Sequence, residues 1–273
     1  MPGTELISPV ALSASSISMR SKQSLFIFAH QDDEFGVFSE IERKIQGNER
    51  VFILYLTSGG PTGAGTPRRD AESLRILKRM GVQERDIFFL GSTLAIPDGK
   101  LVEYLDPAWR ALQDLWHQLG GVDDLYVLAW EGGHQDHDAA HLLGVALASC
   151  HGILARCHQF CLYTGRGLAG SLFRLFAPDP ANGPLHVTRI PWQKRWCHLQ
   201  FVLMYPSQVK TWMGLFPFFL FHYLFRGTQV LQPVSLDRLN EAPHPGSLLY
   251  ERRGFYRRID FSQHATQFLR QRQ

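Results

Sequence analysis

The strongest constraint on the fold is an apolar run that stops abruptly against a cluster of ionisable side chains. Residues 24–29 (SLFIFA) are typical of a buried strand, and four ionisable residues follow within five positions: His30, Asp32, Asp33 and Glu34. Open α/β sheets form their ligand crevices at the carboxyl ends of the strands. Crowding three carboxylates is costly unless a positive charge lies among them. The stretch therefore predicts a strand that delivers polar groups to a charged site.

The spacing within this cluster suggests a metal site. His30 and Asp33 are three residues apart, so a helix that begins here turns both toward one ion and turns Asp32 away from it. The alternative is an ordinary helix N-terminus, where acidic side chains cap free N–H groups and complement the helix dipole. A third ligand from another part of the chain is needed to favour the metal site.

A second strand of the same design lies about a hundred residues further along the chain. Residues 125–130 (LYVLAW) are apolar and lead into a turn that contains His134, Asp136 and His137, after which residues 139–148 have a helical pattern. Two such turns meet at one edge of the sheet if their strands are parallel neighbours. The matched pair of clusters therefore favours a shared metal site.

These two clusters carry a family resemblance. AHQDDE followed by GGHQDHD resembles the PIG-L/LmbE-like family of zinc-dependent N-deacetylases, which includes the N-acetylglucosaminyl-phosphatidylinositol and mycothiol-pathway deacetylases. The family pattern is AHPDDE followed by HPDH. Gln31 and Gln135 stand where the family usually has proline, which removes some turn rigidity but no ligand.

The resemblance implies a role for each residue of the motifs. It implies one Zn²⁺ per chain, bound by His30, Asp33 and His137, with Fe²⁺ or another divalent ion as an alternative. It further implies that Asp32 is the general base and that His134 stabilises the transition state. The reaction expected is hydrolysis of the amide of an N-acetylated amino sugar or glycoconjugate.

The expected chemistry follows from this ligand set. Two imidazoles and a carboxylate leave a zinc ion with an open position for water, whose pKa falls to about 7. Asp32 then takes the proton of that water, and a protonated His134 compensates the oxyanion. Asp136, two residues further on, is expected to orient His134 and keep it protonated. Asp32 or His134 then protonates the leaving amine, which predicts a bell-shaped pH profile.

Two further residues are candidate substrate contacts. Arg69 and Glu72 resemble an R-x-x-E element of the family, in which the arginine reaches the substrate; the alternative is a surface ion pair. Asp98 lies in the loop Ile96-Pro-Asp-Gly, which resembles a family loop whose acidic residue contacts sugar hydroxyls. The alternative for Asp98 is a simple turn.

The order of the expected elements predicts an α/β fold of the Rossmann-like type. Strands at 24–29, 51–56, 86–90 and 125–130 alternate with helices at 34–45, 67–80 and 106–119. Right-handed crossovers then give a mostly parallel sheet in a three-layer sandwich, with the active site at the carboxyl ends of the strands.

The length of 273 residues suits one domain at 24–273, preceded by a loose N-terminal arm at 1–23. The second half, from about 164, is expected to be less regular. It contains an expected strand at 158–163, an expected helix at 193–204, a Y-x-S-Q element at 205–208 that resembles the family, and an expected strand pair or strand plus turn at 250–261.

Residues 212–225 (WMGLFPFFLFHYLF) are unusually apolar. The run is too short and too interrupted by Pro217 to span a bilayer. Either it is buried in the core or under a partner, or it forms an aromatic wall that accepts a lipid or an aglycone. The partners expected are a small-molecule or lipid-linked N-acetyl sugar, with a peripheral membrane contact or a homo-oligomer contact through 212–226 left open.

Composition excludes other classes. A formal net charge of +3 without alternating aromatic and basic residues does not indicate nucleic-acid binding. Residues 1–23 do not have the pattern of a secretory signal, and four cysteines without C-x-x-C spacing indicate reduced thiols in a cytoplasmic protein. The alternatives that remain are a non-haem iron enzyme with the same ligand set, a non-catalytic metal-binding or interaction protein, and a membrane-docked enzyme acting on a glycolipid.

Overall fold

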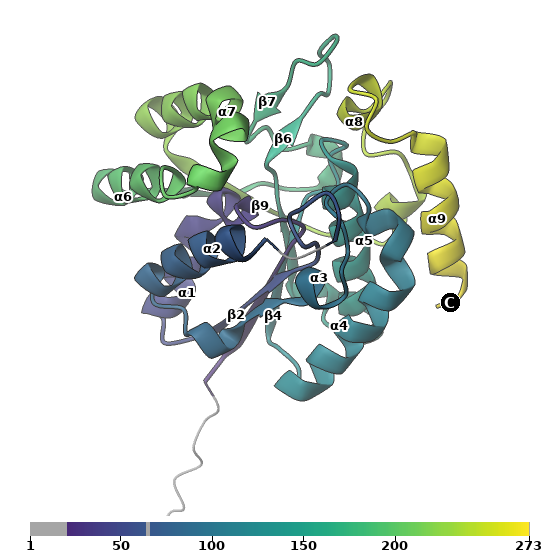
Figure 1. The fold of residues 1–273 in the computed structure, drawn as a ribbon, viewed down its shortest axis with the longest axis horizontal. Coiled ribbons are helices and arrows are strands. Elements are labelled where there is room, and N and C mark those ends of the chain that lie inside the picture. The colour runs from purple at the N-terminus through teal and green to yellow at the C-terminus, as the bar shows by residue number, and fades with distance from the viewer. Residues whose placement is uncertain (1–20, 64–65, 273) are drawn as a thin grey trace, which may run out of the picture.

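The computed structural model describes residues 21–63 and 66–272, and is built around one central sheet (Figure 1). Its strands run in the order β3-β2-β1-β4-β5-β9-β8. The parallel strands are β1 (Gln23–Phe28), β2 (Arg50–Tyr55), β3 (Ile87–Phe89), β4 (Asp124–Leu128) and β5 (Cys157–Phe160); β9 (Thr228–Pro233) and β8 (His186–Arg189) extend the sheet antiparallel. The predicted mostly parallel α/β fold is confirmed. Residues 1–20 of the predicted arm lie outside the described residues.

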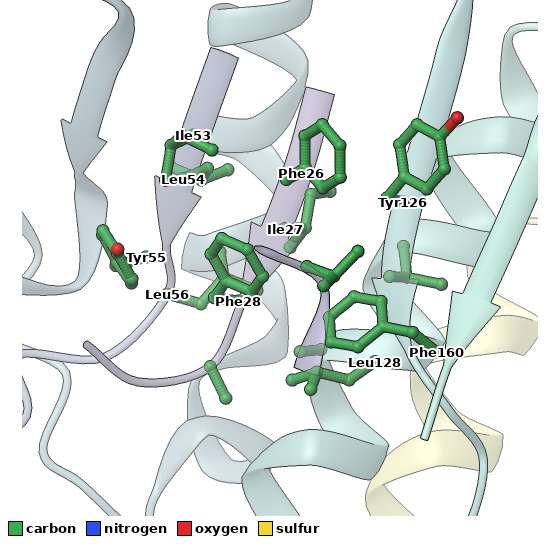
Figure 2. Packing of buried hydrophobic residues seen from close by; sticks show 14 of the residues in the cluster. Phe26, Ile27, Phe28, Ile53, Leu54, Tyr55, Leu56, Tyr126, Leu128 and Phe160 are labelled. Atoms are coloured by element: carbon green, nitrogen blue, oxygen red, sulfur yellow. The ribbon is translucent and has the colours of Figure 1, made fainter. Parts of the chain in front are cut away.

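Strand β1 lies at the centre of the sheet, and this position brings the two motifs together. It pairs with β2 on one side and with β4 on the other, with Phe26 opposite both Ile53 and Tyr126. Every residue of β1 is buried, as expected for a strand covered on both faces. The rings of Phe26 and Tyr126 stack with centroids 4.3 Å apart (Figure 2). The turns that follow β1 and β4 are therefore neighbours, as the sequence predicts.

Helices cover both faces of the sheet. In Figure 1, α1 and α2 lie on one side, and α4 and α5 lie on the other. Their bounds are Phe38–Gln46 for α1, Pro67–Met80 for α2, Leu90–Thr93 for the short α3, Leu105–Leu119 for α4 and Gln135–Cys150 for α5. Single 3-10 turns occupy Asp33–Gly36, Glu84–Asp86, Leu101–Tyr104, Leu154–Arg156, Pro180–Asn182, Pro206–Gln208 and Asp237–Asn240.

The first helix begins later than predicted. The sequence pattern places its start at Glu34, but residues Asp33–Gly36 form a separate 3-10 turn and α1 starts at Phe38. The break falls at Val37, whose φ of −141° and ψ of 17° are not helical. Because the turn is separate from the helix, the directions of its acidic side chains are not fixed by the helical repeat of α1.

The second half of the described chain is mostly helical. It contains α6 (Trp192–Val202), α7 (Val209–Phe221) with a π-helical continuation at His222–Arg226, α8 (Leu249–Arg252), α9 (Arg258–Arg270), and the small hairpin of β6 (Tyr163–Thr164) and β7 (Arg174–Leu175). None of the helices in the described ranges is long and apolar enough to cross a membrane.

The predicted strand pair, or strand plus turn, at 250–261 is wrong, because α8 and α9 occupy most of this stretch. Glu251 explains the difference, because its carboxylate accepts hydrogen bonds from the backbone N–H of Leu248 at 3.0 Å and from that of Arg258 at 3.0 Å. These two residues mark the starts of α8 and α9. One side chain therefore satisfies N-terminal donors of both helices.

Candidate active site

The first turn is closed by its own aspartate. Asp33 Oδ2 accepts hydrogen bonds from the backbone N–H of Ala29 at 3.0 Å and from that of His30 at 2.8 Å. Its other oxygen lies 3.2 Å from Nε2 of His137, which comes from the second turn. Burial would raise the pKa of Asp33, but the imidazoles of His137 and His30 hold it well below its usual value. Asp33 is therefore an anion that joins the two motifs.

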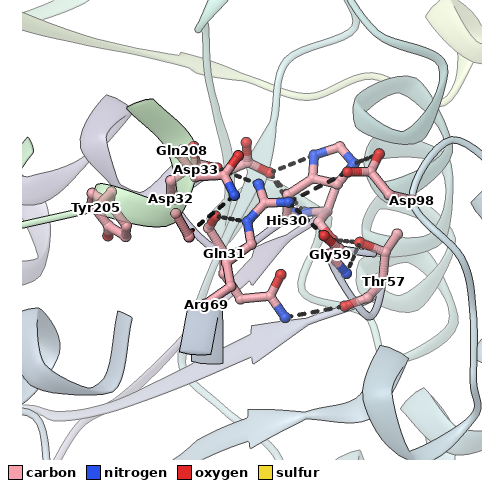
Figure 3. A network of polar contacts seen from close by, with 12 residues as sticks. His30, Gln31, Asp32, Asp33, Thr57, Gly59, Arg69, Asp98, Tyr205 and Gln208 are labelled. Atoms are coloured by element: carbon pink, nitrogen blue, oxygen red, sulfur yellow. Dashed lines mark hydrogen bonds and ion pairs between the residues drawn. The ribbon is translucent and has the colours of Figure 1, made fainter. Parts of the chain in front are cut away.

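Asp32 has a strained backbone and faces the site. Its φ of 115° lies in the left-handed region, which non-glycine residues rarely adopt and which costs free energy. Its N–H donates to Glu34 Oε2 at 2.9 Å, and its carboxylate accepts from Arg69 Nη2 at 2.9 Å (Figure 3). Burial raises the pKa of Asp32 to about 7, although the Arg69 charge opposes this rise.

Glu34 holds the first turn in place through buried hydrogen bonds. It is fully buried, and its Oε1 accepts hydrogen bonds from the hydroxyls of Tyr55 at 2.8 Å and Tyr205 at 2.5 Å. Because Glu34 Oε2 holds the N–H of Asp32, the two tyrosines stabilise the backbone that presents the candidate base.

Tyr205 belongs to the Y-x-S-Q element, which makes a second contact with the first half of the chain. Ser207 donates from its N–H to Glu72 at 3.1 Å, and its hydroxyl donates to the same carboxylate. Gln208 lies at the wall of the cavity. The element thus ties the start of α7 to the first turn and to α2.

Arg69 is buried and directs its guanidinium at several protein acceptors. Nε donates to the carbonyl of Gln31 at 2.8 Å, and Nη1 donates to the carbonyl of Gly59 at 2.9 Å (Figure 3). The alternative of an Arg69–Glu72 surface pair is wrong, since both side chains are buried and Glu72 pairs with Arg68 instead. Arg69 borders the cavity, so its contact with substrate stays a prediction.

His134 begins the second motif as the N-cap of α5. Its Nδ1 accepts a hydrogen bond from the N–H of Asp136 at 3.2 Å. A nitrogen that accepts carries no proton, so the proton of the neutral ring lies on Nε2. Burial and the neighbouring His30 lower the pKa of His134 to about 4. This geometry contradicts the expected protonated His134 and gives a neutral Nε2–H donor instead.

The expectation that the carboxylate of Asp136 orients His134 is also wrong, since only its backbone N–H contacts that ring. The Asp136 carboxylate points away toward the loop after β3, where it accepts from the N–H of Gly99 at 2.6 Å and from that of Leu101 at 2.9 Å. Its Oδ2 also lies 3.0 Å from Nε2 of His30. Asp136 therefore fixes the ring of His30 and the loop at 98–101.

Asp98 lies in that loop and joins the same cluster. Its Oδ1 lies 3.1 Å from His30 Nε2, and its Oδ2 lies 3.4 Å from Arg69 Nη1. Burial would raise the pKa of Asp98, but His30 and the guanidinium of Arg69 hold it far below its usual range. Asp98 lines the cavity and is partly exposed, so the predicted contact with sugar hydroxyls stays a prediction.

The donor set fits a divalent cation. His30, His134 and His137 each bring a ring nitrogen within 4.8 Å of the others, and His30 Nδ1 lies 3.6 Å from Asp33 Oδ2. Nδ1 of His137 is buried and has no hydrogen-bond partner among the described residues. Imidazole and carboxylate groups of this kind suit Zn²⁺ and related ions. The predicted ligands His30, Asp33 and His137 are thus gathered at one place, and the ligand set stays a prediction.

The site opens into a cavity of about 340 Å³ with a polar base and a partly apolar wall. His30, Asp32, Asp33 and His137 are among its lining residues. Aromatic side chains that no motif marks contribute to its wall: Phe35, Tyr163, Phe173 and Phe255. They come from segments far apart in the sequence, so only the folded structure reveals them.

The fold and the site together define an α/β protein with a candidate divalent-metal site at the carboxyl ends of its parallel strands. Residues 25–148 match the model of the PIG-L family, described as GlcNAc-PI de-N-acetylase. The family resemblance is therefore confirmed over this part of the chain. None of the curated proteins matches the sequence.

Solved structures support the same fold. The zinc-inhibited form of teicoplanin deacetylase Orf2 superposes with a TM-score of 0.58 at 15% identity, over 78% of this chain and 98% of that chain. The N,N'-diacetylchitobiose deacetylase from Pyrococcus horikoshii gives 0.54 at 15% identity, over 82% and 88%. The conserved protein TT1542 from Thermus thermophilus gives 0.54 at 20% identity, over 80% and 95%. At these identities the likeness concerns the fold.

Proposed function

We propose that this chain is a metal-dependent hydrolase that removes the acetyl group from an N-acetylated amino sugar or glycoconjugate. The observation that carries the proposal is the convergence of two strand-end turns, where Asp33 Oδ1 lies 3.2 Å from His137 Nε2 and Asp32 faces the same cavity. The family description and the deacetylase names of the similar structures support the same reaction.

The proposed reaction begins with the binding of one divalent ion, Zn²⁺ or another, by His30, Asp33 and His137. When bound, such an ion supplies a water molecule with a pKa near 7 and a positive charge that polarises a carbonyl group. Asp32 takes the proton of the attacking water. Its salt bridge with Arg69 fixes the carboxylate at the cavity wall, so little reorganisation is needed for this transfer.

His134 stabilises the charge that develops on the amide oxygen. Its Nδ1 is held by the N–H of Asp136, so Nε2–H is available as a donor to the tetrahedral oxyanion. A neutral donor suffices here, since hydrogen bonds to an oxyanion in a water-poor site are strong. Asp32 then returns its proton to the leaving amine as the C–N bond breaks, which gives acetate and a free amino sugar.

Asp136, which the sequence marks as catalytic, acts in this scheme as a positioning residue. It holds His30 at 3.0 Å and the loop at 98–101 through two backbone N–H groups. That loop carries Asp98, which we propose accepts hydrogen bonds from sugar hydroxyls, with Arg69 contacting the substrate at the same wall of the cavity. A cytoplasmic location is part of the proposal, because all four cysteines are free.

The decisive test is the isosteric change Asp32→Asn, assayed with N-acetylated sugars for release of free amine in the presence of added Zn²⁺. We expect at least about a thousandfold loss of turnover with metal content near that of the wild type. His137→Ala should lose both metal and turnover. The control Asp114→Asn changes an exposed carboxylate and should leave both unchanged.

Other outcomes separate the alternatives. Turnover retained in the Asp32→Asn variant would contradict the assignment of the base, and loss of metal in that variant would mean that Asp32 is a ligand. A wild type that binds metal but releases no amine from any sugar tested would favour a non-catalytic metal-binding protein. Consumption of oxoglutarate and oxygen would favour a non-haem iron enzyme.

A further inference from the structure

Helix α7 and its π-helical continuation present an apolar stripe to the solvent. Met213, Phe221 and Phe225 are 74%, 59% and 70% exposed, and Val209 and Pro217 are exposed between and beside them. These positions are four residues apart, so they lie in one row along the helix. The rings of Phe221 and Phe225 are in contact, with centroids 4.6 Å apart.

The stripe is separate from the face of α7 that holds the helix on the protein. Trp212, Phe219 and Tyr223 are buried and pack on one another and on Phe35. The apolar run at 212–225 therefore has two faces: one is buried in the core, and the other is exposed to solvent.

The exposed face is large for a soluble surface. Four side chains of this segment that are half or more exposed, including Phe218, present on the order of 500 Å² of apolar surface. The neighbouring α6 adds the exposed rings of Trp192 and Trp196. Apolar patches of this size on a protein usually mark a binding surface.

The segment that forms this face carries acidic residues nowhere in its sequence. Residues 180–236 contain five basic residues and no aspartate or glutamate, although the whole chain has 25 acidic residues. Arg189 and Arg226 are exposed and make no ion pair with any residue that the structure describes. Lys194 of α6 pairs with Glu42 of α1 at 3.1 Å, so the charge of the face comes from these two arginines. Exposed aromatic rings beside unpaired arginines are complementary to an anionic lipid surface.

The exposed face is continuous with the mouth of the candidate active site. Thr211, Gly214 and Leu215 of α7 line the cavity. Phe218 contacts Phe173, another residue of the cavity wall, with ring centroids 5.2 Å apart. A surface that covers the stripe would therefore lie beside the cavity entrance.

We propose that the exposed face of α6 and α7 docks on the surface of an anionic lipid bilayer, with the rings of Phe221 and Phe225 inserted among the headgroups. The protein then binds the membrane peripherally, with the cavity mouth next to the lipid surface. Lipid is favoured over a second copy of the chain because two copies would bring like-charged surfaces together, whereas an anionic bilayer neutralises them. The binding does not depend on the proposed reaction.

The test is co-sedimentation of the full chain with vesicles of phosphatidylcholine alone and of phosphatidylcholine with phosphatidylserine. The wild type should pellet with the anionic vesicles and much less with the neutral ones, and high salt should weaken the binding. The double change Phe221→Glu with Phe225→Glu should lower the apparent vesicle affinity at least about tenfold.

A matched control and a milder variant keep the test sharp. Ile259→Glu places a charge at a 59% exposed apolar residue on α9, which lies on the opposite side of the molecule from α7 (Figure 1), and should change the affinity less than twofold. Phe221→Ser with Phe225→Ser should weaken binding in the same direction without adding charge. Circular dichroism spectra that match the wild type show that the variants are folded.

Three results would overturn the proposal. The first is that the wild type stays in the supernatant with anionic vesicles. The second is that the Phe221/Phe225 variants pellet as well as the wild type. The third is that sedimentation velocity shows a wild-type dimer and monomeric variants, in which case a second copy covers the face. Because none of these measurements uses turnover, failure here leaves the proposed deacetylation to be judged by its own assay.

Discussion

Tyr205→Phe should destabilise the protein through a single lost hydrogen bond. The phenol of Tyr205 is buried and donates to Glu34 Oε1 at 2.5 Å, and the ring itself remains in the variant. A hydrogen bond to a charged group contributes about 1.5–3 kcal/mol. Tyr55 still donates to the same oxygen at 2.8 Å, so the carboxylate is not left without a partner. We expect a loss of about 2 kcal/mol.

The assay is equilibrium unfolding in urea with the metal in excess, in which the midpoint falls while the m-value stays the same. Tyr223→Phe is the matched control, because that buried hydroxyl lies 3.4 Å from His198 Nδ1, which is a long contact. It should cost less than about 1 kcal/mol. The double change of Tyr55 and Tyr205 to Phe should cost more than the sum of the single changes, since the buried oxygen then has no donor.

The same variant tests the link from Tyr205 to the candidate base. Glu34 Oε2 holds the N–H of Asp32, whose left-handed backbone depends on this support. Turnover in Tyr205→Phe should therefore fall more than in Tyr223→Phe, with metal content unchanged. A Tyr205→Phe variant as stable and as active as the Tyr223→Phe control would refute the reasoning.

The remaining predictions concern packing, pH and metal. Gly91→Ala should cost about 1–3 kcal/mol in urea unfolding because a Cβ there would overlap the backbone of Thr57, whereas Gly214→Ala on α7 meets open space and should be neutral or stabilising by up to about 1 kcal/mol. Burial lowers the pKa of His141, which contacts the carbonyl of Leu128, to about 4. Because this histidine has a pKa near 6.5 in the unfolded chain, the free energy of unfolding should fall by about 3 kcal/mol between pH 6.5 and pH 4. In the His141→Asn variant, the free energy of unfolding should decline less over the same pH range. Chelation should abolish turnover reversibly, and adding back an ion to 100 times its dissociation constant should stabilise the fold by about 2.7 kcal/mol in thermal or urea unfolding.

Local sequence patterns predict the strands and the turns of the site but not the directions of its side chains. The runs at 24–29 and 125–130 are strands because continuous apolar residues suit a sheet covered on both faces. Their adjacency follows from the parallel topology. The direction of Asp136 depends instead on where the loop at 98–101 lies, since that loop supplies the N–H groups that its carboxylate accepts. No pattern within the motif records this.

Contacts between distant segments are the other part that the sequence does not reveal. Glu34 and Tyr205 are 171 residues apart, and each is ordinary in its local context. The prediction for the terminal segment is wrong for a related reason, because the alternating aromatic and basic residues at 250–261 suggest strands until Glu251 is seen to cap two helices. In both cases a buried or partly buried carboxylate finds its donors in the whole structure.

The crowded carboxylates after β1 do not by themselves require a metal ion. Asp32 forms a salt bridge with the guanidinium of Arg69, and Glu34 accepts hydrogen bonds from two phenols and a backbone N–H. Asp33 is different, because one oxygen is held by backbone N–H groups and the other faces an imidazole of the second motif. This placement brings a carboxylate oxygen and imidazole nitrogens of both motifs around one point, which is the kind of donor set that a divalent cation binds. The metal site is therefore argued from the placement of Asp33 between His30 and His137, and not from the number of acidic residues in the turn.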